Sequence, residues 1–223
     1  MSNPSVPLID IHTHNVPFDR QIAILNVYPN NPIPENLPEN SYCSSGVHPW
    51  YPEEWEKQIE SLSALVRDKK IIAIGECGLD KKTFTLFSLQ ENIFNKQIEL
   101  SEQYKLPLII HCVKAHNELI QTHIRVKPEM IWIVHGFNSN LEIANQCINS
   151  GMMLSFGKIL LQNDAKITKV VKDIPVSKIF LETDESGISI LEIYNCYAKI
   201  KNMKLEVLKA EMLKNFYECF KID

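Results

Sequence analysis

Short apolar runs rich in Ile and Val alternate with longer segments of helical period along most of this 223-residue chain. An apolar run of about four to eight residues is typical of a buried strand, whereas apolar residues three or four positions apart indicate an amphipathic helix. Strands that alternate with helices favour a parallel sheet covered by those helices. This alternation restricts the chain to an α/β fold before any motif is considered.

Eight segments have the composition of strands, and seven have the period of helices. The predicted strands are Leu8–His12, Gln21–Val27, Ser41–Gly46, Ile71–Glu76, Pro107–His111, Met130–His135, Met152–Phe156 and Lys178–Thr183. The predicted helices are Pro52–Arg67, Ser88–Tyr104, Ala115–Val126, Ser139–Asn149, Leu160–Asp173, Ile188–Ile200 and Lys204–Phe220. Eight strands with helices between most of them predict a distorted (β/α)8 barrel of the TIM type, and an open doubly wound sheet is the alternative.

The segment Asn15–Asn40 is rich in proline and contains no convincing helix. Proline removes a backbone donor and disrupts a helix interior. The first outer helices of the barrel are therefore expected to be shortened or missing, so that loops join the first three strands.

Composition places the chain among ordinary globular proteins, with 45% hydrophobic and 22% charged residues. Its length suits one well-filled core, so residues 1–223 are expected to form a single domain and a monomer. No apolar run has the length of a membrane span and no leader sequence opens the chain, which predicts a cytoplasmic protein without membrane contact. A formal net charge of -4 argues against broad electrostatic attachment to nucleic acid.

Polar side chains gather where the predicted strands end. In a (β/α)8 barrel, the functional groups come from the C-terminal ends of the strands and their following loops. Two histidines two residues apart on one strand also point to the same face. The residues in such positions are His12, His14, His48, Glu76, His111, His135 and Asp184. His116 and His123, by contrast, fall seven apart within a predicted helix and are expected at its surface.

Four imidazoles and two carboxylates of this set are what two divalent cations need when water and substrate complete the coordination. Two dications bring +4 and Glu76 and Asp184 return -2, so the site is expected to attract a phosphate. Asp10 is expected either to orient an imidazole or to cap the backbone, and the sequence leaves both readings open. Trp50, just after His48, is either an ordinary exposed side chain or a substrate contact.

Several of these residues lie in motifs that resemble one family. The motifs, in chain order, are Asp10 with His12-Thr13-His14, Gly46-Val47-His48-Pro49, Gly75-Glu76-Cys77-Gly78-Leu79-Asp80, Ile110-His111-Cys112, His135-Gly136-Phe137 and Leu181-Glu182-Thr183-Asp184. Gln90, Phe94 and Gln97 and the closing segment Asn215–Phe220 add to the pattern. Together they resemble the TatD-type metal-dependent hydrolases, a deoxyribonuclease family of the amidohydrolase-like superfamily.

The resemblance implies a distorted (β/α)8 barrel with two divalent metal ions, Zn, Mn or Mg. One ion would be held by His12, His14, Glu76 and Asp184, and the other by Glu76, His111 and His135. Zn or Mn is expected to bind more tightly than Mg, because imidazole is softer than the oxygen ligands that Mg prefers.

The activity that the resemblance implies is that of a two-metal phosphodiesterase, a DNase or exonuclease that hydrolyses nucleic acid ends with metal-activated water. Glu76 and Asp184 would be the catalytic carboxylates, Glu76 as the bridge between the metals and Asp184 as the ligand that accepts the proton. Asp10, His48 and Trp50 would support the ligands or contact the substrate, and DNA is the expected substrate.

The sequence departs from the family pattern beside two of the ligands. Val113 and Lys114 follow His111-Cys112, where the family usually has Arg and then Asp, so an Arg that could fork onto a phosphate is missing. Glu185-Ser186-Gly187 follows Asp184, where the family usually continues with Ala or Ser, Pro and an aromatic residue. These departures leave two alternatives: a metal-dependent hydrolase of another ester or amide, and a metal-binding protein with little turnover.

Overall fold

The computed structural model describes residues 6–17 and 21–222. Its eight strands lie in one sheet in sequence order, and each pairs in parallel with the next. They are β1 (Leu8–Thr13), β2 (Gln21–Asn26), β3 (Ser41–Ser45), β4 (Ala73–Asp80), β5 (Leu108–Val113), β6 (Trp132–Val134), β7 (Met153–Phe156) and β8 (Ile179–Leu181). This order confirms the predicted (β/α)8 barrel and excludes a doubly wound sheet, whose strand order reverses at a switch point.

All seven predicted helices are present. They are α1 (Trp55–Arg67), α2 (Phe87–Tyr104), α3 (His116–Val126), α4 (Leu141–Asn149), α5 (Ala165–Asp173), α6 (Ile190–Lys201) and α7 (Leu205–Phe220). The predicted helix Leu160–Asp173 is divided into a 3-10 turn, η1 (Lys158–Gln162), and α5. The division falls where Asn163 adopts a left-handed conformation and the Asp164 carboxylate accepts hydrogen bonds from the first backbone N–H groups of α5.

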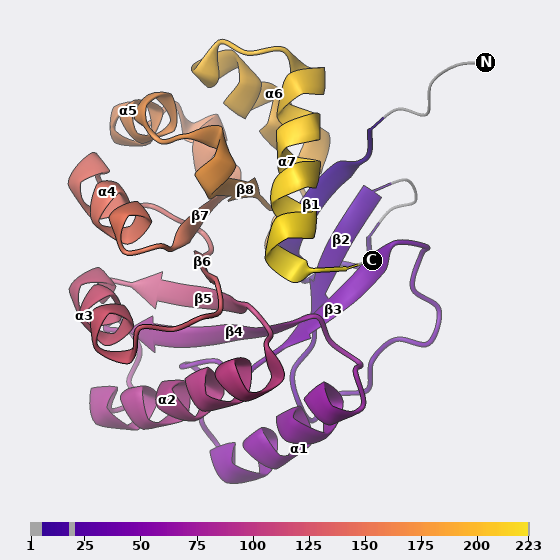
Figure 1. Cartoon of the computed structure of the whole chain (residues 1–223), viewed down its shortest axis with the longest axis vertical. Coiled ribbons are helices and arrows are strands. Elements are labelled where there is room, and N and C mark those ends of the chain that lie inside the picture. The colour runs from indigo at the N-terminus through magenta and orange to yellow at the C-terminus, as the bar shows by residue number, and fades with distance from the viewer. Residues whose placement is uncertain (1–5, 18–20, 223) are drawn as a thin grey trace.

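The helices surround the strands except beside β2 and β3, where only a loop covers the barrel (Figure 1). Among the described residues, no helix joins β1 to β2 or β2 to β3. Residues 18–20 of the segment Asn15–Asn40 lie outside the described residues, and for the rest of it the prediction of loops in place of helices is confirmed.

Strand β4 is longer than predicted and runs past Glu76 to Asp80. Its register against β5 shifts between Ile74 and Cys77, so Glu76 lies in a bulge and not at a strand end. Beyond the bulge, a Cβ atom on Gly78 would lie 2.1 Å from the carbonyl oxygen of His111, so only glycine allows the strands to pair this closely. The prediction that Glu76 and His111 end their strands was therefore wrong, because this pairing extends both strands.

Strand β8 has only three residues, and a few polar contacts complete the closure of the barrel between β8 and β1. The Asp184 N–H donates to the carbonyl of His12 (2.9 Å), and the His14 N–H donates to the carbonyl of Asp184 (3.2 Å). The buried Asp10 carboxylate accepts hydrogen bonds from the backbone N–H (3.0 Å) and the hydroxyl (2.6 Å) of Thr183. This closure places His12, His14 and Asp184 at one point of the rim.

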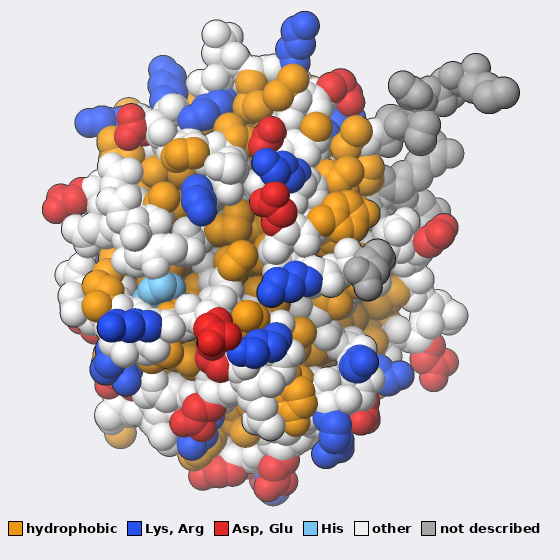
Figure 2. Space-filling view, viewed as in Figure 1, with side chains coloured by type: hydrophobic (Ala, Val, Ile, Leu, Met, Phe, Trp, Pro, Cys, Tyr) orange, Lys and Arg blue, Asp and Glu red, His pale blue; other side chains and the backbone are white. Residues whose placement is uncertain are grey.

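The face shown in Figure 2 carries basic and acidic side chains interspersed with apolar ones, and no large area of one charge forms on it. That mixture agrees with the modest net charge of -4. Within residues 6–17 and 21–222, no helix combines the length and hydropathy that crossing a membrane requires.

Asn215 attaches the last helix to the short strand β8. Its buried side-chain amide donates to the carbonyl oxygens of Val176 and Ile179, each at 2.9 Å. Both carbonyl groups lie in or beside the 3-10 turn η2 (Val176–Lys178) that leads into β8. The position of β8 therefore depends on this one side chain as well as on its strand neighbours.

We expect Asn215→Ala to lower the free energy of unfolding by about 1–3 kcal/mol, because two carbonyl groups lose a buried partner. Urea denaturation followed by circular dichroism measures the loss. Asn195→Ala, at an exposed position of α6, is the matched control and should change the free energy of unfolding by less than about 0.5 kcal/mol. Equal effects of the two substitutions would contradict this role of Asn215.

Candidate metal centre

The carboxylate of Glu76 lies at the centre of the polar cluster on the rim. Its Oε1 atom is 3.0 Å from His48 Nε2, 2.8 Å from His111 Nδ1 and 2.8 Å from His135 Nε2. Its Oε2 atom is 3.4 Å from the Nε2 atoms of both His12 and His14. Burial alone would raise the pKa of Glu76, but the surrounding imidazoles outweigh burial and hold that pKa well below its ordinary value.

Asp184 completes the cluster from beyond β8. Its Oδ1 atom is 3.7 Å from Nε2 of His12 and 3.7 Å from Nε2 of His14. The Asp184 side chain is 30% exposed, compared with 7% for Glu76. The structure thus brings together all seven side chains that the sequence placed on the rim, with Asp184 the more accessible of the two carboxylates.

The donor set fits divalent cations. Both ring nitrogens of His12 are buried and have no hydrogen-bond partner among the described residues, which is costly for an imidazole, and a bound cation would satisfy one of the two. His12, His14 and Glu76 each offer one atom within 4.8 Å of the others, and so do His12, His135 and Asp184. A third such group is His48, Glu76 and His111. The cluster therefore offers several groups of three donors that could hold a divalent cation.

His48 has a tautomer that suits a supporting role. The backbone N–H of Trp50 donates to His48 Nδ1 (3.1 Å), so in the neutral ring the proton is on Nε2. That Nε2–H faces Glu76 Oε1 at 3.0 Å and donates to it. Burial lowers the pKa of His48, which favours the neutral ring. In this state His48 orients the Glu76 carboxylate and offers no lone pair to a cation.

Two buried carboxylates that the sequence did not single out contact imidazoles of the cluster. Asp80 Oδ2 lies 3.0 Å from His111 Nε2. Glu182 Oε1 lies 3.4 Å from His135 Nδ1 and accepts a hydrogen bond from the Gly136 N–H at 2.6 Å. A carboxylate behind a ligating imidazole fixes the ring and makes it a stronger ligand. Asp80 follows Glu76 by four residues, and Glu182 precedes Asp184 by two. Side chains an even number of residues apart on a strand point to the same face, and this spacing was the signal in the sequence that could have identified both carboxylates.

These carboxylates also change the electrostatics of the two imidazoles. Burial alone would lower the pKa of His135, but Glu76 and Glu182 outweigh burial and hold that pKa well above its ordinary value. Burial would raise the pKa of Asp80, but hydrogen bonds from His111 and Trp50 lower it to about 2. Asp80 is therefore ionised at any physiological pH and remains available to His111.

Two glutamines of α2 hold the strand ends that carry the site. The Gln97 amide accepts from the Val47 N–H (2.8 Å) and donates to the Val47 carbonyl (3.1 Å), next to His48. The Gln90 amide makes the same pair of contacts with the backbone of Asp80, at 2.7 and 2.9 Å. The two side chains act as rigid links between the outer helix and the rim.

Asp10 does not contact an imidazole. Its side chain takes the backbone-capping role at the junction of β1 and β8, where it binds Thr183. Burial raises the pKa of Asp10 to about 7, in spite of the hydrogen bonds from Thr183. The alternative that Asp10 orients a histidine directly was wrong, since its position on β1 directs it toward β8.

The two other histidines do not join the cluster. His123 was expected at the surface of a helix, but its side chain is 9% exposed and its ring packs edge-on against buried Trp132 at 4.8 Å. His116 is half-buried, with its ring 5.8 Å from that of Phe137. Both face inward because α3 covers the barrel with the side that carries them.

A cavity of about 190 Å³ opens above Glu76. Aromatic side chains line one part of it: Tyr28, Trp50 and Tyr51. Val113, Gly136 and Glu185 line other parts, so the first residue of each segment that departs from the family pattern faces the cavity. Trp50 is 50% exposed and lies at its mouth, whereas Tyr28 comes from the loop after β2 and was not recognised in the sequence.

Comparison with known proteins finds matches to metal-dependent hydrolases and TatD nucleases. Residues 32–221 match the model of the family described as TatD related DNase. An uncharacterized metal-dependent hydrolase of Buchnera aphidicola is 28% identical over 82% of this chain and 75% of its own length. A 3'-5' ssDNA/RNA exonuclease TatD of Pantoea is 28% identical over 64% of this chain, and the match spans only 58% of the Pantoea protein.

Two solved structures share the fold of this chain. The Escherichia coli TatD homologue YJJV has a TM-score of 0.83 and 21% identity, with 97% of this chain and 98% of YJJV aligned. A TatD family hydrolase from Entamoeba histolytica has a TM-score of 0.81 and 19% identity over 98% of this chain and 99% of its own. At 19–21% identity, the similarity to these two structures shows that the fold is shared.

We expect Asp80→Asn to weaken binding of Zn²⁺ to the metal-free protein by about 10- to 100-fold, because an amide supports the His111 ring less strongly than a carboxylate does. Titration calorimetry of the wild-type and variant proteins measures this difference.

Glu118→Gln is the matched control for this prediction. It removes a carboxylate that pairs with Lys81 outside the cluster, and it should leave the Zn²⁺ affinity unchanged. Wild-type affinity in Asp80→Asn would show that His111 needs no such support.

Proposed function

Because this chain belongs to the TatD-related DNase family, we propose that it is a two-metal phosphodiesterase that hydrolyses the ends of nucleic acid strands, with DNA as the main substrate. The observation that carries the proposal is the convergence of four histidines and the Asp184 carboxylate around Glu76 at the floor of an open cavity. Such a constellation suits hydrolysis assisted by a pair of cations.

The proposed ligand sets follow the distances around Glu76. One cation would be held by His12, His14, Glu76 and Asp184, whose facing atoms lie 3.4–3.7 Å apart. The other would be held by Glu76 with His111 and His135. When bound, the two cations would withdraw charge from the phosphate and activate a water molecule near neutral pH.

With two cations bound, the proposed net charge of the site is lower than the charges of the cations and the two ligand carboxylates alone would give. Two dications contribute +4, whereas Glu76 and Asp184 together with the supporting Asp80 and Glu182 contribute -4. The four carboxylates therefore leave the whole centre near neutrality. A phosphate would be held by direct bonds to the cations more than by a net positive field. A centre near neutrality would attract a phosphate only over a short distance.

We assign proton transfer to Asp184. Its side chain is the more exposed of the two central carboxylates and lines the cavity, so it can reach a water molecule beside the substrate and return the proton to solvent. Glu76, whose Oε1 atom alone has three imidazoles around it, would be the ligand that the two proposed sets share. The two carboxylates thus have separate proposed roles, proton acceptor and shared ligand.

The shape of the cavity favours a strand end over the middle of a duplex. A concave pit admits a terminus more easily than a continuous double helix. The Pantoea relative is named a 3'-5' ssDNA/RNA exonuclease, and by this likeness we propose a single strand entered from its 3' end. A monomer is the proposed working form, because every group of the centre comes from one chain.

We expect Asp184→Asn to lower kcat on phosphodiester substrates by about 100-fold or more, because the amide removes the base and a ligand charge together. Turnover is measured with Mg²⁺, Mn²⁺ and Zn²⁺ on phosphodiester, phosphomonoester, carboxyl ester and amide reporters. The wild-type protein should prefer phosphodiesters and lose activity to a chelator.

Two results would count against this mechanism. The first concerns an Asp184→Asn protein that calorimetry shows to be loaded with metal. If this variant turns over substrate at nearly the wild-type rate, Asp184 is not the proton acceptor. A preference of the wild-type protein for an amide or carboxyl ester over every phosphodiester would replace the phosphodiesterase with the first alternative, a metal-dependent hydrolase of another ester or amide.

We expect Val113→Arg to lower KM for single-stranded DNA, by up to about tenfold, because a guanidinium in the cavity can bind a phosphate with two hydrogen bonds. The matched control is Val207→Arg, which adds the same charge at a 50% exposed position of α7. If both variants lower KM equally, overall charge explains the effect and Val113 has no specific role.

A further inference from the structure

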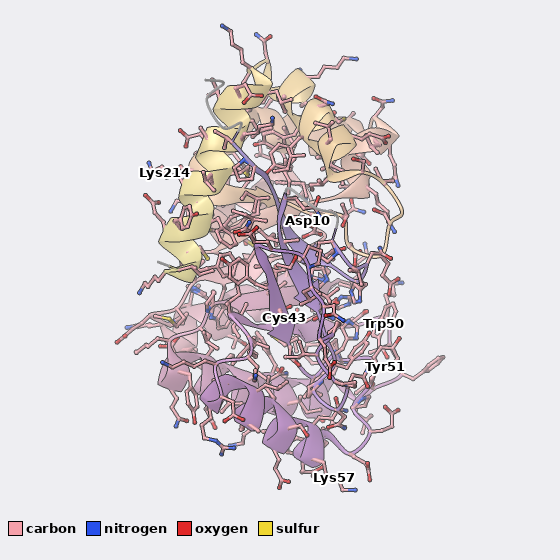
Figure 3. All side chains as sticks on the ribbon, turned by 90° about the vertical axis from the view of Figure 1, so that its right-hand side faces the viewer. Asp10, Cys43, Trp50, Tyr51, Lys57 and Lys214 are labelled. Atoms are coloured by element: carbon pink, nitrogen blue, oxygen red, sulfur yellow. The ribbon has the colours of Figure 1, made fainter. Side chains whose placement is uncertain are left out.

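One part of the cavity consists of three aromatic side chains, which we call the aromatic wall: Tyr28, Trp50 and Tyr51. Trp50 and Tyr51 are neighbours at one edge of the molecule, opposite the edge that carries Lys214 of α7 (Figure 3). They are 50% and 47% exposed, although both are large enough to be buried in a core. Exposed aromatic area beside a site of hydrolysis suggests a binding surface.

The turn that carries Trp50 is fixed before any ligand arrives. The Tyr51 N–H donates to the carbonyl of His48 (3.0 Å), and the Trp50 N–H donates to His48 Nδ1 (3.1 Å). The indole Nε1–H of Trp50 donates to Asp80 Oδ2 at 2.6 Å. A ligand that binds Trp50 therefore meets a preorganised ring, and little conformational entropy is lost.

These contacts determine what Trp50 can recognise. Its only polar group is occupied by Asp80, so the indole offers an apolar face and no hydrogen-bond donor. Tyr51 stands 6.5 Å from Trp50 and 5.6 Å from Tyr28, ring centre to ring centre, and both pairs meet edge to face, so Tyr51 does not continue the plane of the Trp50 ring. His48, which orients Glu76, and the proposed metal ligand His111 lie 5.2 and 5.7 Å from the Trp50 ring, so a group on the wall is adjacent to the reacting phosphate.

We propose that the aromatic wall stacks on the unpaired base of the nucleotide next to the scissile phosphate, with Trp50 as the main contact. This inference rests on the proposed phosphodiesterase function and names the form of its substrate. A base has a flat face of the right size, and stacking on a face without donors accepts every base. A paired terminal base would first have to separate from its partner, so the wall selects single-stranded ends.

The test compares a natural oligonucleotide with one that carries an abasic residue at its terminal positions. The wild-type protein should show a KM for the abasic strand about tenfold higher than for the natural strand, because one stacked base is lost. Trp50→Ala should raise KM for the natural strand by about the same factor and treat both strands alike. Trp50→Phe, which keeps a ring, should retain part of the discrimination.

Binding without turnover gives a second readout. Quenching of tryptophan fluorescence is titrated with a thymidine nucleotide and with deoxyribose 5-phosphate, which lacks a base. We expect quenching by the nucleotide alone, and its loss in Trp50→Ala. The matched control is Phe84→Ala, which removes a fully exposed aromatic ring of the loop after β4 that does not line the cavity, and it should behave as the wild-type protein does.

The outcomes separate this inference from the proposed function. Equal KM values of the wild-type protein for natural and abasic strands, or full discrimination in Trp50→Ala, would overturn the stacking role while phosphodiester hydrolysis stands. Hydrolysis of neither strand would contradict the proposed function, and the fluorescence titration would then decide whether the wall binds a base.

Discussion

A single buried carboxylate, that of Glu76, organises the rim of this barrel. An isolated charge at 5% exposure is strongly unfavourable, and the protein compensates by placing five imidazoles around its two oxygen atoms. These imidazoles come from β1, β5 and the segments that follow β1, β3 and β6, so the carboxylate needs most of the barrel to be in place. A bound cation would extend the same compensation, because it would attract the carboxylate and use imidazole lone pairs.

The barrel supplies the positions that this arrangement requires. The bulge in β4 moves Glu76 out of the regular ladder, while Gly78 lets the strand continue against β5 as far as Asp80. On the other side, Asp10 and Thr183 hold β8 against β1 near Asp184. Irregular strand geometry at two places therefore sets the distances of the centre, and α2 secures the result through Gln90 and Gln97.

The sequence predicted all eight strands, all seven helices and the seven rim side chains, because burial and helical period leave a strong pattern in a parallel barrel. It did not predict the length of β4, since a bulge depends on how closely β5 approaches. Asp80 and Glu182 were missed as partners of histidines for a related reason: their roles come from contacts between different strands. Asp10 could be assigned only after the register of β1 against β8 was known.

Asp80 connects the aromatic wall to the imidazoles around Glu76. One of its oxygen atoms, Oδ2, contacts both the Trp50 indole of the aromatic wall and the His111 imidazole beside Glu76. Groups that share a partner are energetically coupled, so the effects of removing Trp50 and His111 should not be additive. A new residue at position 50 would therefore alter the environment of His111, and the substitutions tolerated at one position would depend on the residue at the other.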